Sequence, residues 1–127
     1  MKRKAALVFG SAAVAVLITG GQAQADHVCT KNITDTGAGT VGQVRFYTEG
    51  DVFHLYDLNC NDGRGIRGEW KYAGESVWRH FGSHTQGCTN NPQRYTDGNL
   101  QEDGIINIRA RRTGGAWTSM NCRNHNT

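Results

Sequence analysis

Histidines are the residues of this chain best suited to acid–base chemistry or metal binding, and the sequence holds five of them: His27, His54, His80, His84 and His125. His80 and His84 stand four residues apart, a spacing that places two imidazoles on one face of a helix. The residues around them follow the pattern of a strand that runs into a loop, so the spacing does not predict a metal site. We interpret the histidines as surface or turn residues, and expect no metal and no cofactor.

A second set of potential ligands lies between residues 57 and 63, where Asp57, Asn59 and Asn61 place oxygen atoms at alternate positions. This spacing is typical of the first half of a calcium-binding EF-hand loop. The required glycine comes one residue late, and Gly68 stands where the loop needs a bidentate glutamate. The segment therefore reads as a turn anchored by Cys60, with bound calcium as the open alternative.

Cleavage of a phosphodiester by acid–base catalysis needs a base, an acid and a cation that holds the phosphate. The chain offers Glu69, His54, His80 and Arg67 for these roles. The sequence contains no Gly-x-Ser-x-Gly segment to mark a serine nucleophile, and the cysteines are assigned to disulfides. We expect no catalytic residues, and keep a small extracellular hydrolase or nuclease as an alternative.

Tryptophans point to a binding surface, because large aromatic side chains supply much of the energy of binding. The candidate binding residues are Trp78, Arg79, His80 and Trp117. Two interpretations of Trp78 stay open: a binding residue, or a core residue followed by an arginine whose charged end reaches water. The tripeptide 78–80 resembles the Trp-Arg-Tyr of the actinomycete proteinaceous α-amylase inhibitors, which are small β-sandwiches with two disulfides. That resemblance implies a function as inhibitor of a secreted hydrolase.

The sequence contains four cysteines that could form disulfides: Cys29, Cys60, Cys88 and Cys122. Zinc sites favour cysteines two to four residues apart, whereas these are separated by about thirty residues each. Two disulfides are therefore expected, and three pairings are possible. Among them we favour the pairs that are neighbours in sequence, Cys29–Cys60 and Cys88–Cys122.

Alternation of apolar and polar residues dominates the chain after residue 25 and predicts strands with one buried face. The clearest strand runs from 66 to 72, and a turn at 49–51 joins 44–48 to 52–56 as a hairpin. Further strands are expected near 28, at 77–81, 105–110 and 116–120. About seven strands in all predict an all-β, antiparallel two-sheet sandwich, Ig-like or similar, with an open barrel as alternative. Residues 82–99 are expected to be the main irregular region.

The hairpin region 52–72 also carries a family resemblance. A strand ending in Tyr56-Asp57, a turn with Cys60 and Asp62-Gly63, and then Gly65-Ile66-Arg67-Gly68 resemble a class of small secreted actinobacterial proteins of mostly unknown function. A tryptophan and a cysteine of the last strand extend the likeness. The resemblance implies a β-sandwich and an extracellular setting, and it brings no catalytic residues.

The N-terminus predicts export. A basic cluster at 2–4, an apolar run from Ala5 to Ile18 and the small residues Ala23-Gln24-Ala25 have the order of a secretory signal peptide. The apolar run is shorter than the roughly 20 residues that span a bilayer. We predict a signal peptide over residues 1–25 and a single mature domain over 26–127. No membrane association is expected after cleavage.

The net charge of the predicted mature chain restricts the possible partners. Without Lys2, Arg3 and Lys4 the chain keeps eleven basic residues against eleven acidic ones, a net charge of zero that does not favour nucleic acid as a partner. The basic cluster of Arg109, Arg111 and Arg112 is interpreted as a solvated strand end rather than a phosphate site. We expect a secreted, monomeric, non-enzymatic protein that binds an extracellular protein or a cell-wall glycan through its loops.

Overall fold

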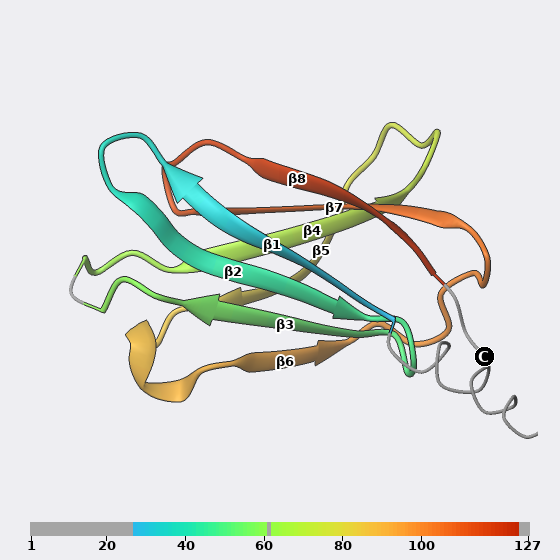
Figure 1. Ribbon diagram of the computed structural model, residues 1–127, viewed down its shortest axis with the longest axis horizontal. Helices are drawn as coiled ribbons and strands as arrows, with labels where there is room; N and C mark the ends of the chain where they lie inside the picture. Colours follow the sequence, from blue (N-terminus) through green and yellow to red (C-terminus); the bar gives the residue numbers. More distant parts are fainter. Residues whose placement is uncertain (1–26, 61, 125–127) are drawn as a thin grey trace, which may run out of the picture.

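The computed structural model describes residues 27–60 and 62–124, and within them the chain forms two four-stranded antiparallel sheets that stack as a sandwich (Figure 1). The first sheet has the order β1-β2-β3-β6 and the second the order β5-β4-β7-β8. The strands of the first are β1 (Val28–Asp35), β2 (Gly39–Tyr47), β3 (Val52–Asp57) and β6 (Gln93–Thr96). Those of the second are β4 (Ile66–Tyr72), β5 (Arg79–His84), β7 (Ile105–Arg112) and β8 (Thr118–Arg123). The predicted all-β, antiparallel two-sheet fold is confirmed, while the predicted signal peptide lies outside the described residues.

The core lies between the two sheets and is built from the inward-facing half of each alternating strand. The β2–β3 hairpin is confirmed, with Phe46 opposite Phe53 in its register. Phe53 stacks on Phe81 of the second sheet with ring centroids 4.1 Å apart, so the two layers meet through aromatic rings. Trp70 is buried and Tyr72 packs against the core, as the alternation of β4 predicts.

The second sheet owes its close inner packing to two glycines. A Cβ atom at Gly68 would lie 2.1 Å from the ring of Phe81, and one at Gly82 would lie 2.5 Å from the ring of Tyr95. Each ring therefore covers a position where only glycine fits. The pairing of β4 with β5 shifts by one residue just after Gly68, which brings His80 opposite Glu69 on the outer face of the sheet.

Eight strands are present in the described residues, where the sequence predicts about seven, and the difference is β6. Residues 82–99 are not mainly irregular: they hold the end of β5, the 3-10 helix η2 (Gly87–Asn90) and β6. β6 is a short edge strand whose residues Gln93, Arg94 and Thr96 are polar. Only Tyr95 packs against the core, so the strand offers too little alternation to be recognised.

The expected pairing of the cysteines is wrong. The disulfides are Cys29–Cys122 and Cys60–Cys88. The first joins β1 to β8, because the first and last strands lie next to each other at one edge of the sandwich (Figure 1). It spans 93 residues of sequence, and a loop of about that length corresponds to roughly 4–5 kcal/mol in the chain-entropy model. Proximity in sequence is a poor guide where sheet topology decides which strands meet.

Candidate functional site

The outer face of the second sheet carries a row of cations and tryptophan rings in contact. The Arg109 guanidinium carbon lies 4.2 Å from the centroid of Trp78 and 4.1 Å from that of Trp117. The Arg111 guanidinium carbon lies 4.4 Å from the centroid of Trp117, and Lys71 Nζ lies 4.8 Å from that of Trp78. All four contacts are within the range of cation–π attraction. We call these five residues the cation–tryptophan ladder.

The register of the strands gives the order of the ladder. Arg109 and Arg111 face outward from β7 two residues apart, which places their Cα atoms about 7 Å from each other. A ring within 4.4 Å of both guanidinium carbons therefore lies between them. Lys71 is the cross-strand partner of Asn107, two residues before Arg109, and Trp78 accordingly lies between Lys71 and Arg109. The order along β7 is thus Lys71, Trp78, Arg109, Trp117, Arg111.

Both rings come from loops that lead into strands. Trp78 directly precedes β5 and Trp117 directly precedes β8, and both side chains are half-buried. Each ring is thus partly accessible to solvent while two cations lie over it. The interpretation of Trp78 as a core residue is wrong, because the side chain packs on the outside of the sheet.

Glu69 pairs with the central arginine of the ladder, Arg109, and with Arg67. Its Oε1 atom lies 2.6 Å from Arg109 Nη2, and its Oε2 atom lies 3.2 Å from Arg67 Nη2. Burial alone raises the pKa of the Glu69 carboxyl, but hydrogen bonds from Arg109 and Arg67 outweigh burial and hold the pKa below its usual range. Glu69 is therefore ionised at neutral pH. The outward-facing strand positions of β4 and β7 set four cations against this one carboxylate.

The four residues predicted to bind do not form one cluster. Trp78 and Trp117 meet through Arg109, as described above. Arg79 pairs with Glu75, with Nη2 and Oε2 3.0 Å apart, and its guanidinium carbon lies 4.7 Å from the centroid of Trp70. His80 Nε2 lies 2.9 Å from Ser83 Oγ on the outer face. Trp78 and Arg79 thus engage different partners, although they are adjacent in sequence.

The basic cluster at the end of β7 is not a solvated strand end. Arg112 is buried between the sheets, with Nη2 2.6 Å from Asp35 Oδ2 and Nη1 3.1 Å from Asp62 Oδ2. Hydrogen bonds to Asp35 and then Asp62 raise the pKa of Arg112 above its already high value. Arg109 and Arg111 belong to the ladder on the opposite side of the strand.

The histidines are spread over the molecule. His84 is fully buried, with Nε2 2.8 Å from Asn91 Oδ1, so its interpretation as a surface or turn residue is wrong. His54 faces outward from the first sheet and contacts the ring of Tyr47. Burial and then the charges of Arg94 and Arg45 lower the pKa of His54, which favours the neutral imidazole. Of the acid–base candidates, Glu69, His80 and Arg67 share one face, and His54 lies on the other sheet.

The loop considered for calcium uses its carboxylates within the protein. Asp57 is buried and its Oδ1 accepts the backbone N–H of Asn59, while Asp62 pairs with Arg112. Burial raises the pKa of Asp57, which disfavours a charged ligand at that position. Among the residues that the structure describes, no three acidic, histidine or cysteine side chains are placed to hold a metal ion. Asn61 lies outside that set.

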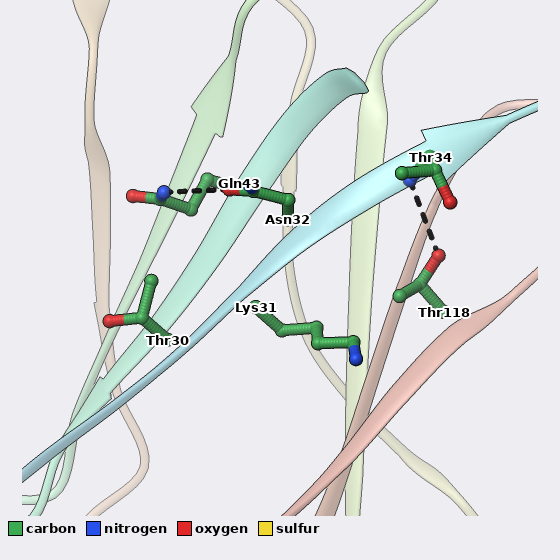
Figure 2. A pocket seen from close by; sticks show the side chains of 6 residues that line it. All are labelled: Thr30, Lys31, Asn32, Thr34, Gln43 and Thr118. Atoms are coloured by element: carbon green, nitrogen blue, oxygen red, sulfur yellow. Dashed lines mark hydrogen bonds between the residues drawn. The ribbon is translucent and has the colours of Figure 1, made fainter. Parts of the chain in front are cut away.

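A groove and a smaller hollow lie on the surface of the described residues. The larger is an open groove of about 460 Å³ between β1 and β8, lined only by polar side chains (Figure 2). Its amides are engaged with each other, since Gln43 Nε2 donates to Asn32 Oδ1 at 2.9 Å. Thr34 N donates across the groove to Thr118 Oγ1 at 3.4 Å, and Lys31 is its single charged residue. The smaller hollow, of about 210 Å³, lies where β4 begins and β5 and β7 end, and its lining includes Arg67 and Arg111.

Arg67, Lys71, Arg109 and Arg111 were not among the predicted binding residues. Their signal in the sequence is the charged half of the alternation in 66–72 and 105–112, opposite the apolar half that predicts the strands. Alternation shows that these residues face outward, but the register that places β4 beside β7 comes only from the fold.

Comparison with protein-family models, with curated proteins and with solved structures finds no match to the chain. Within the described part, no helix has the length and apolar character needed to cross a membrane. The two disulfides fit an oxidising compartment.

Proposed function

We propose that this chain is an extracellular, non-enzymatic binding protein that holds an acidic glycan on the outer face of its second sheet. The observation that carries the proposal is the cation–tryptophan ladder. Guanidinium and ammonium groups recognise carboxylates and phosphates through charge and N–H donors. Here Arg109 and Arg111 lie about 7 Å apart along β7, and Lys71 of β4 continues the row beside Asn107, a linear arrangement that suits a chain of repeated negative groups.

The ladder also indicates what the surface does not offer. Sugar rings and nucleic-acid bases stack on exposed aromatic faces. Arg109 and Arg111 both lie over the ring of Trp117, and Lys71 and Arg109 both lie over that of Trp78. Stacking by a neutral sugar or an unpaired base would require a cation to leave its ring. The tryptophans instead hold the cations in place, which reduces the entropy lost on binding.

Net charge does not exclude this function, although it is zero for the predicted mature chain. The acids are placed elsewhere: Asp35 and Asp62 neutralise Arg112 between the sheets, and Glu75 pairs with Arg79. Segregation of charge leaves the ladder face positive. Electrostatic attraction at such a face speeds association and is weakened by salt.

Isothermal titration calorimetry with polysaccharides of stated charge tests the proposal. We expect polygalacturonate or a glycerol-phosphate wall polymer to bind, uncharged dextran not to bind, and affinity to fall as salt is raised. Arg111→Gln should weaken binding at least about tenfold. Arg45→Gln is the matched control, because Arg45 stacks on Tyr56 at 4.9 Å on the opposite sheet. Binding of dextran, or of neither acidic polymer, contradicts the proposal.

A second candidate is the cleavage of RNA, favoured by the placement of His80 opposite Glu69 with Arg67 and Arg109 alongside. These are the residue types that a base, an acid and a phosphate-holding cation require. The lowered pKa of Glu69 makes it a weaker base, however, and both of its oxygens are engaged by arginines. Release of nucleotides from RNA by the wild type, abolished in His80→Ala, would favour this candidate over glycan binding.

A further inference from the structure

The smaller hollow lies at the end of the cation–tryptophan ladder and collects three side chains from three neighbouring strands. Ser83 of β5, Arg67 of β4 and Arg111 of β7 are successive cross-strand partners, so they form one row across the sheet. Thr85 and Thr113 complete the polar part of the lining. Its volume of about 210 Å³ is below that of sites for drug-sized ligands and suits one small group.

The charge of this row differs from that of the next row along the strands. In the next row, Glu69 lies between His80 and Arg109 and neutralises an arginine. In the row of the hollow, Arg67 and Arg111 are directly opposite each other; Glu69 reaches Arg67 from the next row, but no acid lies in this row. Like charges directly opposite on neighbouring strands destabilise a sheet. A bound anion between the two guanidinium groups would remove that repulsion.

Both arginines of the hollow have N–H groups without an acceptor in the described part of the protein, while their guanidinium groups are fixed by neighbouring side chains. Arg111 has no carboxylate partner among the residues that the structure describes, and its enclosed Nε has no acceptor there. Its guanidinium group is instead fixed by the ring of Trp117. Arg67 donates to Glu69 through Nε and Nη2, which leaves Nη1 without a partner in that ion pair. When His80 donates to Ser83 Oγ, the serine hydroxyl is free to donate as well.

We infer that this hollow, defined by Arg67, Ser83 and Arg111, binds a single oxyanion: the carboxylate or phosphate substituent of the acidic glycan. The inference rests on the proposed function for the identity of the larger ligand, but not for the anion site itself. Planar guanidinium groups present paired N–H donors that match both kinds of anion. The site therefore gives the ladder a fixed point at which one substituent of the polymer is held.

Small anions test the site without the polymer. In titrations of the folded wild-type protein with sodium phosphate, sulfate and acetate at constant ionic strength, followed by ¹H–¹⁵N NMR, we expect saturable shifts of the amides of Gly65, Ser83, Thr85 and Thr113. Tighter binding of phosphate or of acetate identifies the substituent as phosphate or carboxylate, and tightest binding of sulfate would contradict both assignments. Arg67→Met should weaken binding of that anion at least about tenfold. Ser83→Ala should weaken it severalfold with little disturbance of the charge.

The control is Arg94→Met, which removes an exposed arginine from the first sheet and should leave anion binding within about twofold. Equal losses in the two arginine variants would mean general attraction to positive charge, and would overturn the site. So would the absence of saturable shifts for all three anions. Polymer binding that persists without small-anion binding rejects the site and leaves the proposed function standing. Small-anion binding without polymer binding supports the anion site and rejects the proposed function.

Discussion

Arg111 and Arg112 are adjacent in β7, yet they belong to two regions with opposite chemistry. Arg112 points between the sheets and is held by the carboxylates of Asp35 and Asp62, from the end of β1 and the loop before β4. Arg111 points outward and is held by the ring of Trp117. We call the first region, Arg112 with Asp35 and Asp62, the inner ion cluster. Both regions fix an arginine, but only the ladder leaves its charge uncompensated.

The difference shows how the same residue type is committed to stability or to binding. A guanidinium paired with two carboxylates has no positive charge left to offer a ligand, and breaking a buried pair leaves the other charge unsatisfied. A guanidinium stacked on an aromatic ring gains only a modest attraction from the ring. Its N–H groups form no hydrogen bond with the ring and stay available to a ligand. The inner ion cluster should therefore govern folding, and the ladder should govern binding.

The largest effect on stability is expected from Asp35→Ala in the inner ion cluster. It removes the closer of the two carboxylates from Arg112 and loses two hydrogen bonds to a charged group. The melting temperature should fall by roughly 10 °C, given the size of the domain and the strength of such bonds. The affinity for an acidic polysaccharide should stay within about twofold of the wild type. A variant of unchanged stability but lost affinity would reverse the roles assigned to the two regions.

Trp117→Leu should show the opposite pattern. The ring stacks on Arg109 and Arg111; without it the Arg111 guanidinium loses the ring that fixes it, while Arg109 keeps only Glu69 and Trp78. We expect affinity for the acidic polysaccharide to fall more than about tenfold, with a loss of stability of about 1–2 kcal/mol from two cation–π contacts. Calorimetry and urea unfolding measure the two quantities. Tyr56→Leu is the matched control, because it removes the ring under Arg45 on the first sheet and should leave affinity unchanged.

A smaller effect on stability is expected at Glu69, which forms arginine–carboxylate ion pairs beside the ladder like those of the inner ion cluster. The folded-state pKa of Glu69 is lowered, so its contribution to stability is complete above the ordinary value of 4.5 and is lost as pH falls through the folded-state pKa. Glu69→Gln should lower the free energy of unfolding at neutral pH by about 1 kcal/mol, because Arg67 is substantially exposed.

Urea unfolding from pH 7 to pH 3 checks this prediction for Glu69. The difference in unfolding free energy between wild type and Glu69→Gln should shrink as the solution becomes more acidic. Glu49→Gln, in the exposed turn after β2, serves as control and should follow the wild-type profile. A difference that grows toward acidic pH would mean that Glu69 has a raised pKa, contrary to the ion pairs.

Much of the fold follows from local patterns. The alternation in 66–72 and the hairpin of 44–56 predict β4, β2 and β3, because each strand buries every second residue. β6 escaped prediction since a four-residue edge strand with one core residue carries almost no periodic signal. The disulfide pairing could not be predicted for a different reason. The contact between β1 and β8 depends on the order of all strands in both sheets.

The candidate site was predictable only in its tryptophans. Composition points to Trp78 and Trp117, and the alternation of 66–72 and 105–112 shows that charged residues face outward. Nothing local indicates that Arg67 lies opposite Arg111 or that Trp78 reaches Arg109, because these contacts arise from the register of β4 with β7 and from loop conformations. The net charge of zero also gives no sign that Asp35 and Asp62 pair with Arg112 in the inner ion cluster and leave the ladder face positive.

The most direct measurement uses the three tryptophans of the sequence as separate probes. Each gives one indole N–H signal in a ¹H–¹⁵N spectrum, and Trp70 is an internal reference because its buried indole donates to Asp97. On addition of an acidic polysaccharide, we expect saturable shifts of the Trp78 and Trp117 indole signals, no shift of the Trp70 signal, and no shift of any signal with dextran. Binding that leaves the Trp78 and Trp117 signals unmoved would contradict the claim that the ladder is the binding surface.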